Sequence, residues 1–252
     1  MRYASLGSGS RGNATLVEHG KTRVLIDCGF SLKQVELRLA RLKVCADTLS
    51  AILVSHEHSD HVGGVARLAA KYNIPVWMTA GTHHALKNPG LFVPRLFSSH
   101  QPFAIEALEI EPFPVPHDAK EPCQFVIDDG NQRLAHLTDL GQTTAHIDGL
   151  LAGCSGIMIE TNHDEEMLQN GAYPQALKRR VAGKFGHLSN RQTANILAKL
   201  DFSKVRSLAI GHISEKNNLP HLALAALVDT LDCPADWVGV ATQDQGLDWQ
   251  SV

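Results

Sequence analysis

The sequence predicts a mixed α/β protein on the basis of three observations. Short apolar runs of strand type recur along the chain, each bounded by Gly, Pro, Asn or Asp. Between these runs lie stretches in which apolar residues repeat with the period of an amphipathic helix. The composition, with 44% hydrophobic and 19% charged residues among 252, is typical of a globular chain and excludes disordered and fibrous classes.

The strand-type runs dominate the first half of the chain and alternate with helical patterns in the second half. In chain order, the expected strands are residues 3–6, 14–18, 22–26, 51–54, 76–79, 108–115, 124–127, 133–138, 156–160 and 205–210. The expected helices are residues 32–42, with Ser31 in the position of an N-cap, and residues 62–72, 142–151, 191–200 and 222–231. The polar and basic stretch 162–190 is the most irregular part of the chain.

The chain contains no internal repeat, low-complexity tract or flexible linker, so we expect a single domain over residues 1–252. Its net charge of −3 means that any nucleic-acid partner must be held by a local basic patch and not by bulk charge. The sequence predicts no particular oligomeric state.

The N-terminus and the cysteines indicate a reducing, intracellular setting. The first residues include Gly and Ser where a signal peptide needs a continuous apolar segment, and no stretch reaches the roughly 18 apolar residues of a transmembrane helix. We therefore expect a cytoplasmic protein with no membrane partner. The cysteines are scattered and never in C-x-x-C spacing, which favours free thiols over a disulfide framework or a zinc ribbon. We assign them no chemistry.

The first loop imitates a dinucleotide-binding fingerprint. Residues 7–12 spell G-x-G-x-x-G after a strand, and Asp27 lies about 20 residues beyond the first glycine. That fingerprint must open a helix, whereas residues 13–27 have the pattern of two strands joined at His19 and Gly20. We therefore expect a glycine-rich turn, and an alternative role for its amides is to face an anion in the active site.

The densest cluster of potential metal ligands follows the expected strand 51–54. The run from His56 through His58 and Asp60 to His61 places three imidazoles and a carboxylate within six residues. Such side chains would repel one another if protonated and would be costly to bury unpaired, and a divalent cation removes both problems. The spacing suits two ions, because the first two histidines can point to one side of an extended segment. The alternative is a polar loop with coincidental histidines.

Two ions need more ligands than one loop supplies, and later strand ends offer them. His117 follows the strand 108–115, Asp139 follows 133–138 and His212 follows 205–210. Each of these residues stands where a strand gives way to a loop. The sequence therefore predicts a metal site assembled at several strand ends.

These motifs, in this order and across nearly the whole chain, resemble those of the metallo-β-lactamase superfamily. The resemblance implies a four-layer αββα sandwich of two mixed β-sheets and a site for two divalent ions, zinc, manganese or iron, since His and Asp ligands accept all three. By that resemblance, the first ion is held by His56, His58 and His117 and the second by Asp60, His61 and His212, with Asp139 bridging them and Asp27 orienting the ligand loop.

Further segments narrow the resemblance to the YycJ (WalJ) group of bacterial metallohydrolases. They are residues 6–14, 160–164, 171–174, 177–180, 186–190 and 217–218. Members of that group are regarded as nucleases or phosphodiesterases, usually described as DNA exonucleases of 5′-to-3′ type, which implies a nucleic-acid substrate, DNA more than RNA. A β-lactamase is disfavoured because Asp60 and Asp139 offer oxygen where the main β-lactamase class has a cysteine.

The implied reaction is hydrolysis of a phosphodiester. Two cations about 3.5–4 Å apart lower the pKa of a bridging water, so that a metal-bridging hydroxide attacks while the cations hold the phosphate oxygens. His187 resembles a histidine that tRNA-maturation endonucleases of the superfamily place beside the scissile phosphate, where it would act as an acid. The expected catalytic residues are His187, Asp60 and Asp139. The alternative for His187 is a structural role at the start of the following helix, and His163 is a second candidate for the same rim.

Substrate-binding residues are expected in the irregular stretch and in the first loop. Four positive charges lie within seven residues of a chain whose net charge is negative. Such a run is usually a solvated helix face, but its position between two site residues favours a grip on backbone phosphates, and an aromatic ring beside it can stack a base. The candidates are Lys178, Arg179, Arg180 and Lys184, together with Tyr173, His163, Arg11 and Asn13.

Two other functional classes stay open. An acyl hydrolase, such as a thioesterase or lactonase of glyoxalase II type, would use the same metals without needing His187 or the basic run. A non-catalytic metal-binding module would bind metal and hydrolyse neither phosphodiesters nor thioesters.

Overall fold

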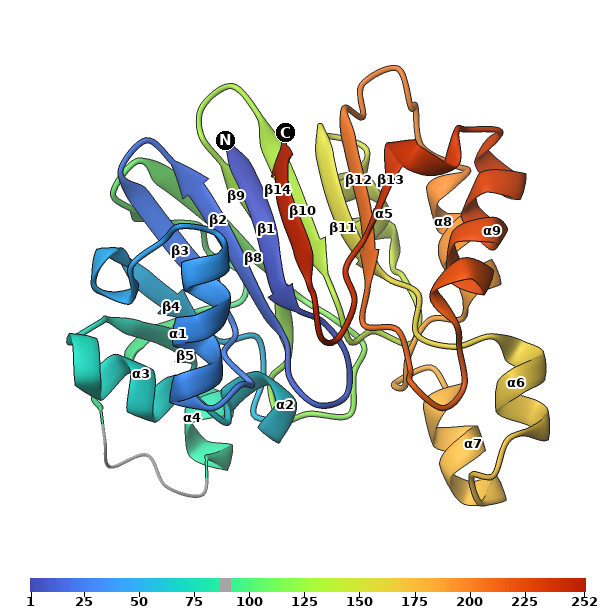
Figure 1. Ribbon diagram of the computed structural model, residues 1–252, viewed down its shortest axis with the longest axis horizontal. Helices are drawn as coiled ribbons and strands as arrows, with labels where there is room; N and C mark the ends of the chain where they lie inside the picture. Colours follow the sequence, from blue (N-terminus) through green and yellow to red (C-terminus); the bar gives the residue numbers. More distant parts are fainter. Residues whose placement is uncertain (87–91) are drawn as a thin grey trace.

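The computed structural model describes residues 1–86 and 92–252, which form two mixed β-sheets packed face to face (Figure 1). The first sheet has seven strands in the order β14 (Leu247–Ser251), β1 (Arg2–Gly7), β2 (Ala14–His19), β3 (Thr22–Ile26), β4 (Ala51–Leu53), β5 (Val76–Thr79) and β6 (Arg95–Phe97). The second has seven in the order β13 (Val238–Val240), β12 (Ser207–Gly211), β11 (Gly156–Glu160), β10 (Arg133–Leu137), β9 (Cys123–Asp128), β8 (Leu108–Pro114) and β7 (Phe103–Ile105).

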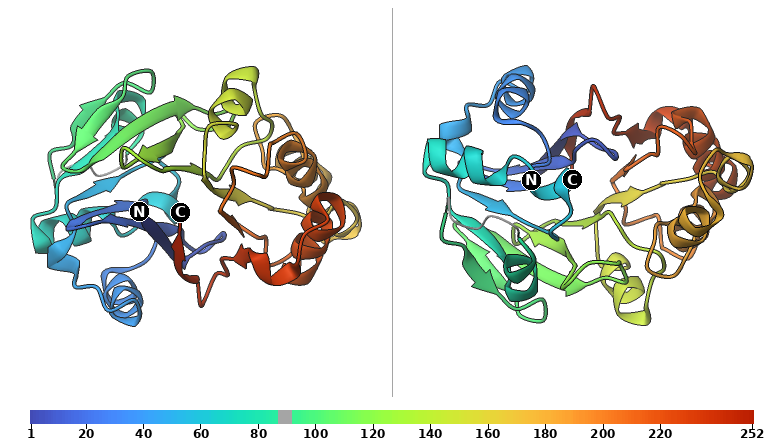
Figure 2. Two further views of the ribbon diagram at one scale, coloured as in Figure 1. Left: turned by 90° about the horizontal axis from the view of Figure 1, so that it is seen from above. Right: turned by 90° about the horizontal axis from the view of Figure 1, so that it is seen from below.

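Helices cover the outer faces of both sheets (Figure 2). The first sheet is covered by α1 (Leu32–Arg41) and α3 (Val65–Tyr72), and the second by α5 (Ala145–Leu151), α8 (Asn190–Leu197) and α9 (Pro220–Leu231). Shorter helices lie in the connections: α2 (Ser59–Val62), α4 (Ala80–Ala85), α6 (Glu165–Asn170) and α7 (Gln175–Val181), with short 3-10 turns at Ala46–Thr48 and Ala235–Trp237.

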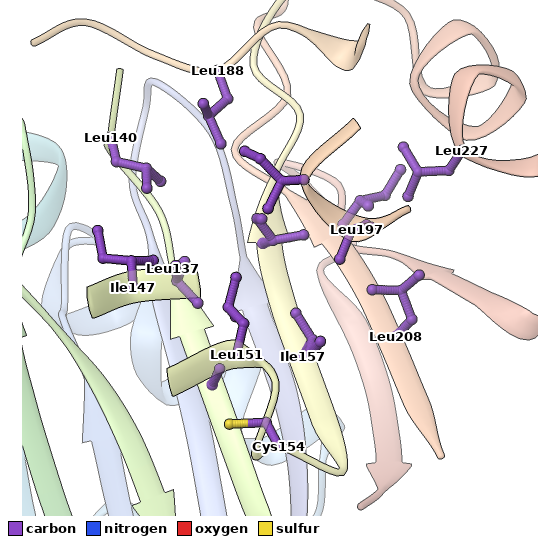
Figure 3. Packing of buried hydrophobic residues seen from close by; sticks show 14 of the residues in the cluster. Leu137, Leu140, Ile147, Leu151, Cys154, Ile157, Leu188, Leu197, Leu208 and Leu227 are labelled. Carbon is purple, nitrogen blue, oxygen red and sulfur yellow. The ribbon is translucent and has the colours of Figure 1, made fainter. Parts of the chain in front are cut away.

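Alternating apolar side chains fix the layers. In β4, Ile52 packs in a buried cluster with α1 and α3, while Ala51 and Leu53 pack in a second cluster between the sheets. In β12, Leu208 belongs to a third cluster with α5, α8 and α9 (Figure 3), and Ala209 faces the other sheet. Successive strand residues point to opposite faces, so both faces of each sheet are buried. Three apolar interfaces therefore separate four layers, and the expected αββα sandwich is confirmed.

The topology brings strand ends together at one end of the sandwich. Strands β3, β4 and β5 are parallel neighbours in the first sheet, and β10, β11, β12 and β13 are parallel neighbours in the second. Their carboxyl ends meet near α2 and α7, at the bottom of Figure 1. The loops after β4, β10 and β12 carry candidate ligands. His117 follows β8, whose carboxyl end lies at the same edge because β8 and β10 are both antiparallel to β9.

The prediction of one helix over residues 62–72 is wrong at its start, because the helix is interrupted after Val62. Helix α2 ends at Val62 and α3 begins at Val65. The intervening Gly64 packs against the loop after β3: its amide donates to the Cys28 carbonyl at 2.7 Å, and a Cβ on Gly64 would lie 1.9 Å from the Phe30 carbonyl oxygen. This close approach requires glycine and interrupts the helix.

The structure confirms some of the predictions made for the first loop, the N-cap and the irregular stretch and contradicts others. Strands β2 and β3 form an antiparallel hairpin with His19 opposite Thr22, so the interpretation of the glycines as a turn, and not as a dinucleotide-binding fingerprint, is confirmed. Ser31 precedes α1, but its side chain makes no capping hydrogen bond. The irregular stretch contains α6 and α7, which were not expected, and α7 has no buried residue that would give it an apolar period. All five cysteines are free.

Candidate metal centre

The ligand-rich loop leaves the end of β4 and enters α2. His56 lies in the extended segment, His58 is the residue immediately before α2, and Asp60 and His61 are on the helix. The first pair of side chains thus leaves extended chain and the second pair leaves a helix, and the ring centroids of His56 and His61 lie 4.1 Å apart. The local sequence therefore presents four donors within one small region.

Backbone contacts with neighbouring loops hold this turn in place. The Asn13 amide donates to the Asp60 carbonyl at 2.8 Å, and the Cys28 amide donates to the His61 carbonyl at 2.7 Å. The chains approach so closely that a Cβ on Gly29 would lie 1.8 Å from the Asp60 carbonyl oxygen. Glycine at position 29 is therefore a requirement of the site's geometry.

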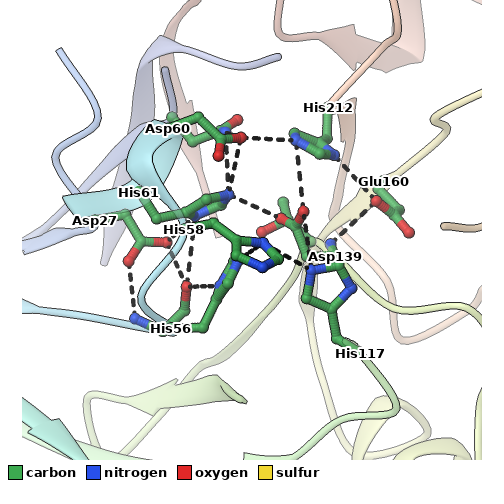
Figure 4. Close-up of polar contacts among 12 residues, drawn as sticks. Asp27, His56, His58, Asp60, His61, His117, Asp139, Glu160 and His212 are labelled. Atoms are coloured by element: carbon green, nitrogen blue, oxygen red, sulfur yellow. Dashed lines mark hydrogen bonds and ion pairs between the residues drawn. The ribbon is translucent and has the colours of Figure 1, made fainter. Parts of the chain in front are cut away.

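His56, His58 and His117 form the first set of donors, here called the three-histidine group (Figure 4). Nδ1 of His58 lies 3.0 Å from Nε2 of His56 and 3.3 Å from Nε2 of His117. Zinc–nitrogen bonds of about 2.0–2.1 Å in a tetrahedral site place ligand atoms about 3.3–3.4 Å apart, so these separations suit one ion. Nδ1 of His56 contacts Ser55 Oγ at 2.9 Å, and Nδ1 of His117 contacts the Gly186 carbonyl at 3.2 Å.

Asp60, His61 and His212 form the second set, here called the mixed group. Oδ2 of Asp60 lies 3.4 Å from Nε2 of His61 and 3.7 Å from Nε2 of His212. The opposite nitrogens face carboxylates: Nδ1 of His61 lies 2.8 Å from Asp27 Oδ2, and Nδ1 of His212 lies 3.2 Å from Glu160 Oε2. These contacts direct both Nε2 atoms toward the shared centre.

Asp139 lies between the two groups (Figure 4). Its Oδ2 is 3.2 Å from Nε2 of His61, and its Oδ1 is 3.6 Å from Nε2 of His212 and 3.9 Å from Nε2 of His117. Among the described residues, neither Asp139 Oδ2 nor His212 Nε2 has a hydrogen-bond partner, although both atoms are buried. Buried polar atoms are almost always paired. The orphaned atoms and the nitrogen and oxygen donors therefore fit divalent metal ions.

Three of these strand-end residues adopt left-handed backbone conformations. The φ angles are 60° at Asp27, 58° at Asp139 and 51° at His212. Asp27 and His212 directly follow β3 and β12, and Asp139 is the second residue after β10. Residues other than glycine rarely adopt such angles, and where they do, the strain often marks a functional site. The sandwich thus holds ligands and their partners in backbone conformations that local preference alone does not favour.

The two groups differ in the charge that their free side chains carry. Burial lowers the pKa of His56 well below its ordinary value and also lowers the pKa of His117. Burial acts in the same direction on His61 and His212, but neighbouring carboxylates, first among them Asp139, outweigh it. They raise the pKa of His61 well above its ordinary value and that of His212 to about 10.

Glu160, the last residue of β11, is a site residue that the sequence reasoning missed. It is fully buried and accepts hydrogen bonds from the backbone amides of Asp139, of the residue after it and of Leu188, at 2.8–3.1 Å. Its Oε2 also lies 3.2 Å from Nδ1 of both His187 and His212. Burial opposes its charge, yet His187 and its other partners lower its pKa to about 2. The signal was available, because an acidic residue ends an apolar strand here just as at Asp139.

A cavity of about 220 Å³ opens beside both groups. Besides candidate ligands of both groups, three further residues expected from the sequence line it: Tyr173, Arg180 and His187. His187 is 20% exposed, and the contact of its Nδ1 with Glu160 leaves Nε2 for the cavity. Arg180 pairs with Asp118, which lines the same cavity. The N-cap of α8 is Ser189, which forms a complete capping box, so the alternative role of His187 as a helix cap is not needed.

The remaining substrate-binding candidates lie elsewhere. Arg11 is paired with Glu215 and Asp244 at 2.8–2.9 Å and is not among the residues lining the cavity. Asn13 is buried behind the mixed group, with Nδ2 3.3 Å from Asp60 Oδ2. Buried His163 lines a separate cavity together with Lys178 and Arg179, while Lys184 is exposed. The basic run is thus divided between two cavities and the surface.

The sequence and fold match those of known proteins. Residues 22–213 match the family described as "Beta-lactamase superfamily domain". The chain is 33% identical over 245 residues to "Exodeoxyribonuclease YycJ" of Bacillus anthracis, covering 96% of this chain and 93% of that protein. It is 33% identical over 237 residues to "Exodeoxyribonuclease WalJ" of Streptococcus pneumoniae serotype 2, covering 92% and 88%.

A solved structure shares the whole fold. The metallo-beta-lactamase fold protein YhfI from Bacillus subtilis superposes with a TM-score of 0.74 and 15% sequence identity, and the match covers 99% of both chains. Among residues 1–86 and 92–252, no helix has the length and apolar character needed to span a membrane.

Proposed function

The chain belongs to the beta-lactamase superfamily, and from this premise we propose that it is a metal-dependent nuclease that hydrolyses phosphodiester bonds with two divalent ions. The observation that carries the proposal is the pair of donor groups sharing Asp139 at the edge of a cavity that also holds His187 and Arg180. Paired cation sites of this kind suit in-line displacement at phosphorus. The metal ions are proposed to be zinc, manganese or iron.

DNA is the proposed substrate, with hydrolysis in the 5′-to-3′ direction. Two relatives that align with nearly the whole chain are named exodeoxyribonucleases. The cavity is open to solvent, and residues 1–86 and 92–252 form no large inserted domain that covers it, so a flexible strand can enter it. Arg180, although paired with Asp118, lies at the cavity and has further guanidinium N–H groups suited to a phosphate of that strand.

In the proposed mechanism, the metal ions and the side chains at the cavity have different roles. When bound, two such ions supply an activated water at neutral pH and neutralise phosphate charge. Glu160 is ionised and holds Nδ1 of His187, which fixes the ring with Nε2 toward the cavity. From this position Nε2 of His187 would donate a hydrogen bond to a phosphoryl oxygen or a proton to the leaving alkoxide. Asp27 and Ser55 hold the ligand loop in place through three hydrogen bonds of 2.7–2.8 Å.

The test is a degradation assay on metal-loaded protein with 5′-labelled and 3′-labelled DNA and RNA of one sequence. We expect mononucleotides to be released from the 5′ end of DNA, with slower turnover of RNA. A thioester and a small dye phosphodiester are assayed beside them. Turnover of the thioester without turnover of any phosphodiester would assign the site to acyl hydrolysis. If the protein bound stoichiometric metal and hydrolysed none of these substrates, it would be a non-catalytic metal-binding module.

A further inference from the structure

A second cavity, of about 310 Å³, lies between α6 and α7. Leu168 and Ala182 give it an apolar wall, and Lys178 and Arg179 bring positive charge to it. Glu165 also lines it, but this carboxylate is paired with Arg191 at 2.7 Å. The cavity therefore combines an apolar interior with unbalanced positive charge at its edge.

Helix α7 separates this second cavity from the metal centre. Successive residues of an α-helix are about 100° apart around its axis. Leu177 and Arg180 line the cavity at the metal centre, whereas Lys178, Arg179 and Ala182 line the second cavity. The two sets lie on nearly opposite faces of α7. The basic run of the sequence thus serves two spaces, one on each side of a single helix.

His163 forms part of the second cavity and has no evident structural partner. The side chain is 2% exposed, and its Nδ1 has no hydrogen-bond partner among the described residues. Burial lowers its pKa to about 4, so the ring is neutral at pH 7 and offers one donor and one acceptor. Gln169 and Gln175 line the same cavity, and Lys178 Nζ donates to the Gln169 carbonyl at 2.6 Å. An apolar slot edged by neutral donors and acceptors matches a nucleobase, which has flat faces and a polar edge.

We infer that the second cavity binds one nucleotide of the substrate strand, with its base between α6 and α7 and its phosphate on Lys178 and Arg179. The strand crosses α7 and continues to the metal centre. A helix is about 10 Å across and stacked nucleotides rise about 3.4 Å, so the bound nucleotide lies about three positions from the scissile bond. This inference rests on the proposed nuclease function and adds a subsite remote from the metals.

The inference is tested by scanning the substrate with abasic residues. A set of DNA strands of about ten nucleotides, each with one abasic residue at a different position, is digested by the metal-loaded wild type. We expect kcat/KM to fall about tenfold at one position, about three from the cleaved bond, which is the size of one base-stacking contact. A profile with no such position would overturn the inference while leaving the nuclease function standing. Failure to digest every intact strand would instead remove the proposed function.

Two variants locate the subsite. Ala182→Phe places a large ring at the wall of the second cavity, keeps both basic residues and should abolish the position dependence of the abasic scan. The double variant Lys178→Ala with Arg179→Ala should flatten the salt dependence of DNA binding by up to about two units. Its control, Lys33→Ala with Lys199→Ala, removes two exposed charges that line neither cavity. An equal change in the control would assign the effect to net charge, and an unchanged abasic scan in a folded Ala182→Phe would place the base elsewhere.

Discussion

His56 and His117 of the three-histidine group and His61 and His212 of the mixed group all present Nε2 toward the centre, but different partners contact the opposite nitrogens of these rings. His56 is backed by the Ser55 hydroxyl and His117 by a backbone carbonyl. His61 and His212 are backed directly by the carboxylates of Asp27 and Glu160. Neutral partners orient a ring, whereas ionised partners also favour its protonated form. The first group is therefore ready for a cation, and the second must first release protons.

The largest predicted effect removes the carboxylate that both groups share. Asp139→Asn should reduce metal content from about two ions per chain toward none and abolish hydrolysis, because the buried site then lacks the charge that balances two cations. Metal analysis after gel filtration measures it. Asp229→Asn, an exposed change on α9, is the matched control. Full occupancy with normal activity in Asp139→Asn would show that the groups bind independently of Asp139.

The next largest predicted effect distinguishes the role of His187, which lines the cavity, from the role of the two donor groups. His187→Ala should keep its metal and lower kcat by roughly 10²–10⁴, the usual contribution of a general acid. His146→Ala on α5, where the ring is exposed, serves as control. Loss of metal together with activity would make His187 a ligand, and normal turnover would make it structural.

A smaller effect tests the partners behind the rings. Asp27→Asn should weaken metal binding at the mixed group by about 10- to 100-fold, as is usual for a group that orients a ligand. Ser55→Ala should act mainly on the three-histidine group, where its hydroxyl contacts His56. Competition with a chelator gives the two affinities separately. Identical losses at both groups in both variants would contradict the distinction between them.

The smallest effect is the number of protons released on binding. The raised pKa values of His61 and His212 mean that both rings carry protons at pH 7 and must lose them to bind a cation. The lowered pKa of His56 means that its ring is already neutral. We expect more than one proton to be released by the mixed group and fewer by the three-histidine group, and metal affinity of the mixed group to fall as pH falls. Calorimetry in two buffers of different ionisation enthalpy measures this, and equal release at both groups would contradict it.

The same pKa shift sets a pH dependence for the metal-free fold. A folded-state pKa of about 10 for His212, against an ordinary value of 6.5, stabilises the fold fully below about pH 6.5. This contribution is lost as pH rises from 6.5 to about 10. His212→Gln should lack this part of the pH dependence in thermal melts of protein treated with chelator.

The sequence predicted the parts of this site that depend on local pattern. Candidate ligands that are close together in the sequence can be identified without knowledge of the fold, as the cluster from His56 to His61 was. Asp139 and His212 followed from their positions at strand ends. Glu160 ends a strand as they do, but its role depends on contacts with residues 21–52 positions away along the chain. Such contacts exist only after the sheet has assembled.

The directions of the side chains in the irregular stretch could not be predicted from the sequence, for a different reason. Helices α6 and α7 have six and seven residues, too short for an apolar period to identify them. Without the helix, nothing in the run of basic residues separates Arg180 from Arg179, although they face different cavities. The position of Arg11 depended in the same way on distant partners, since Glu215 and Asp244 hold it away from the centre.

Both donor groups take residues from loops of both sheets, so a metal ion bound at either group would also have a mechanical role. His58 follows the first sheet and His117 follows the second, as do Asp60 and His212 for the other group. A bound cation is then a crosslink between the two halves of the sandwich, closing chain segments of 59 and 152 residues. Ligands that bind only the folded chain stabilise it, by about 2.7 kcal/mol at a hundredfold excess over Kd. Cations bound at these groups would therefore join the two halves of the sandwich at the edge that carries the cavity.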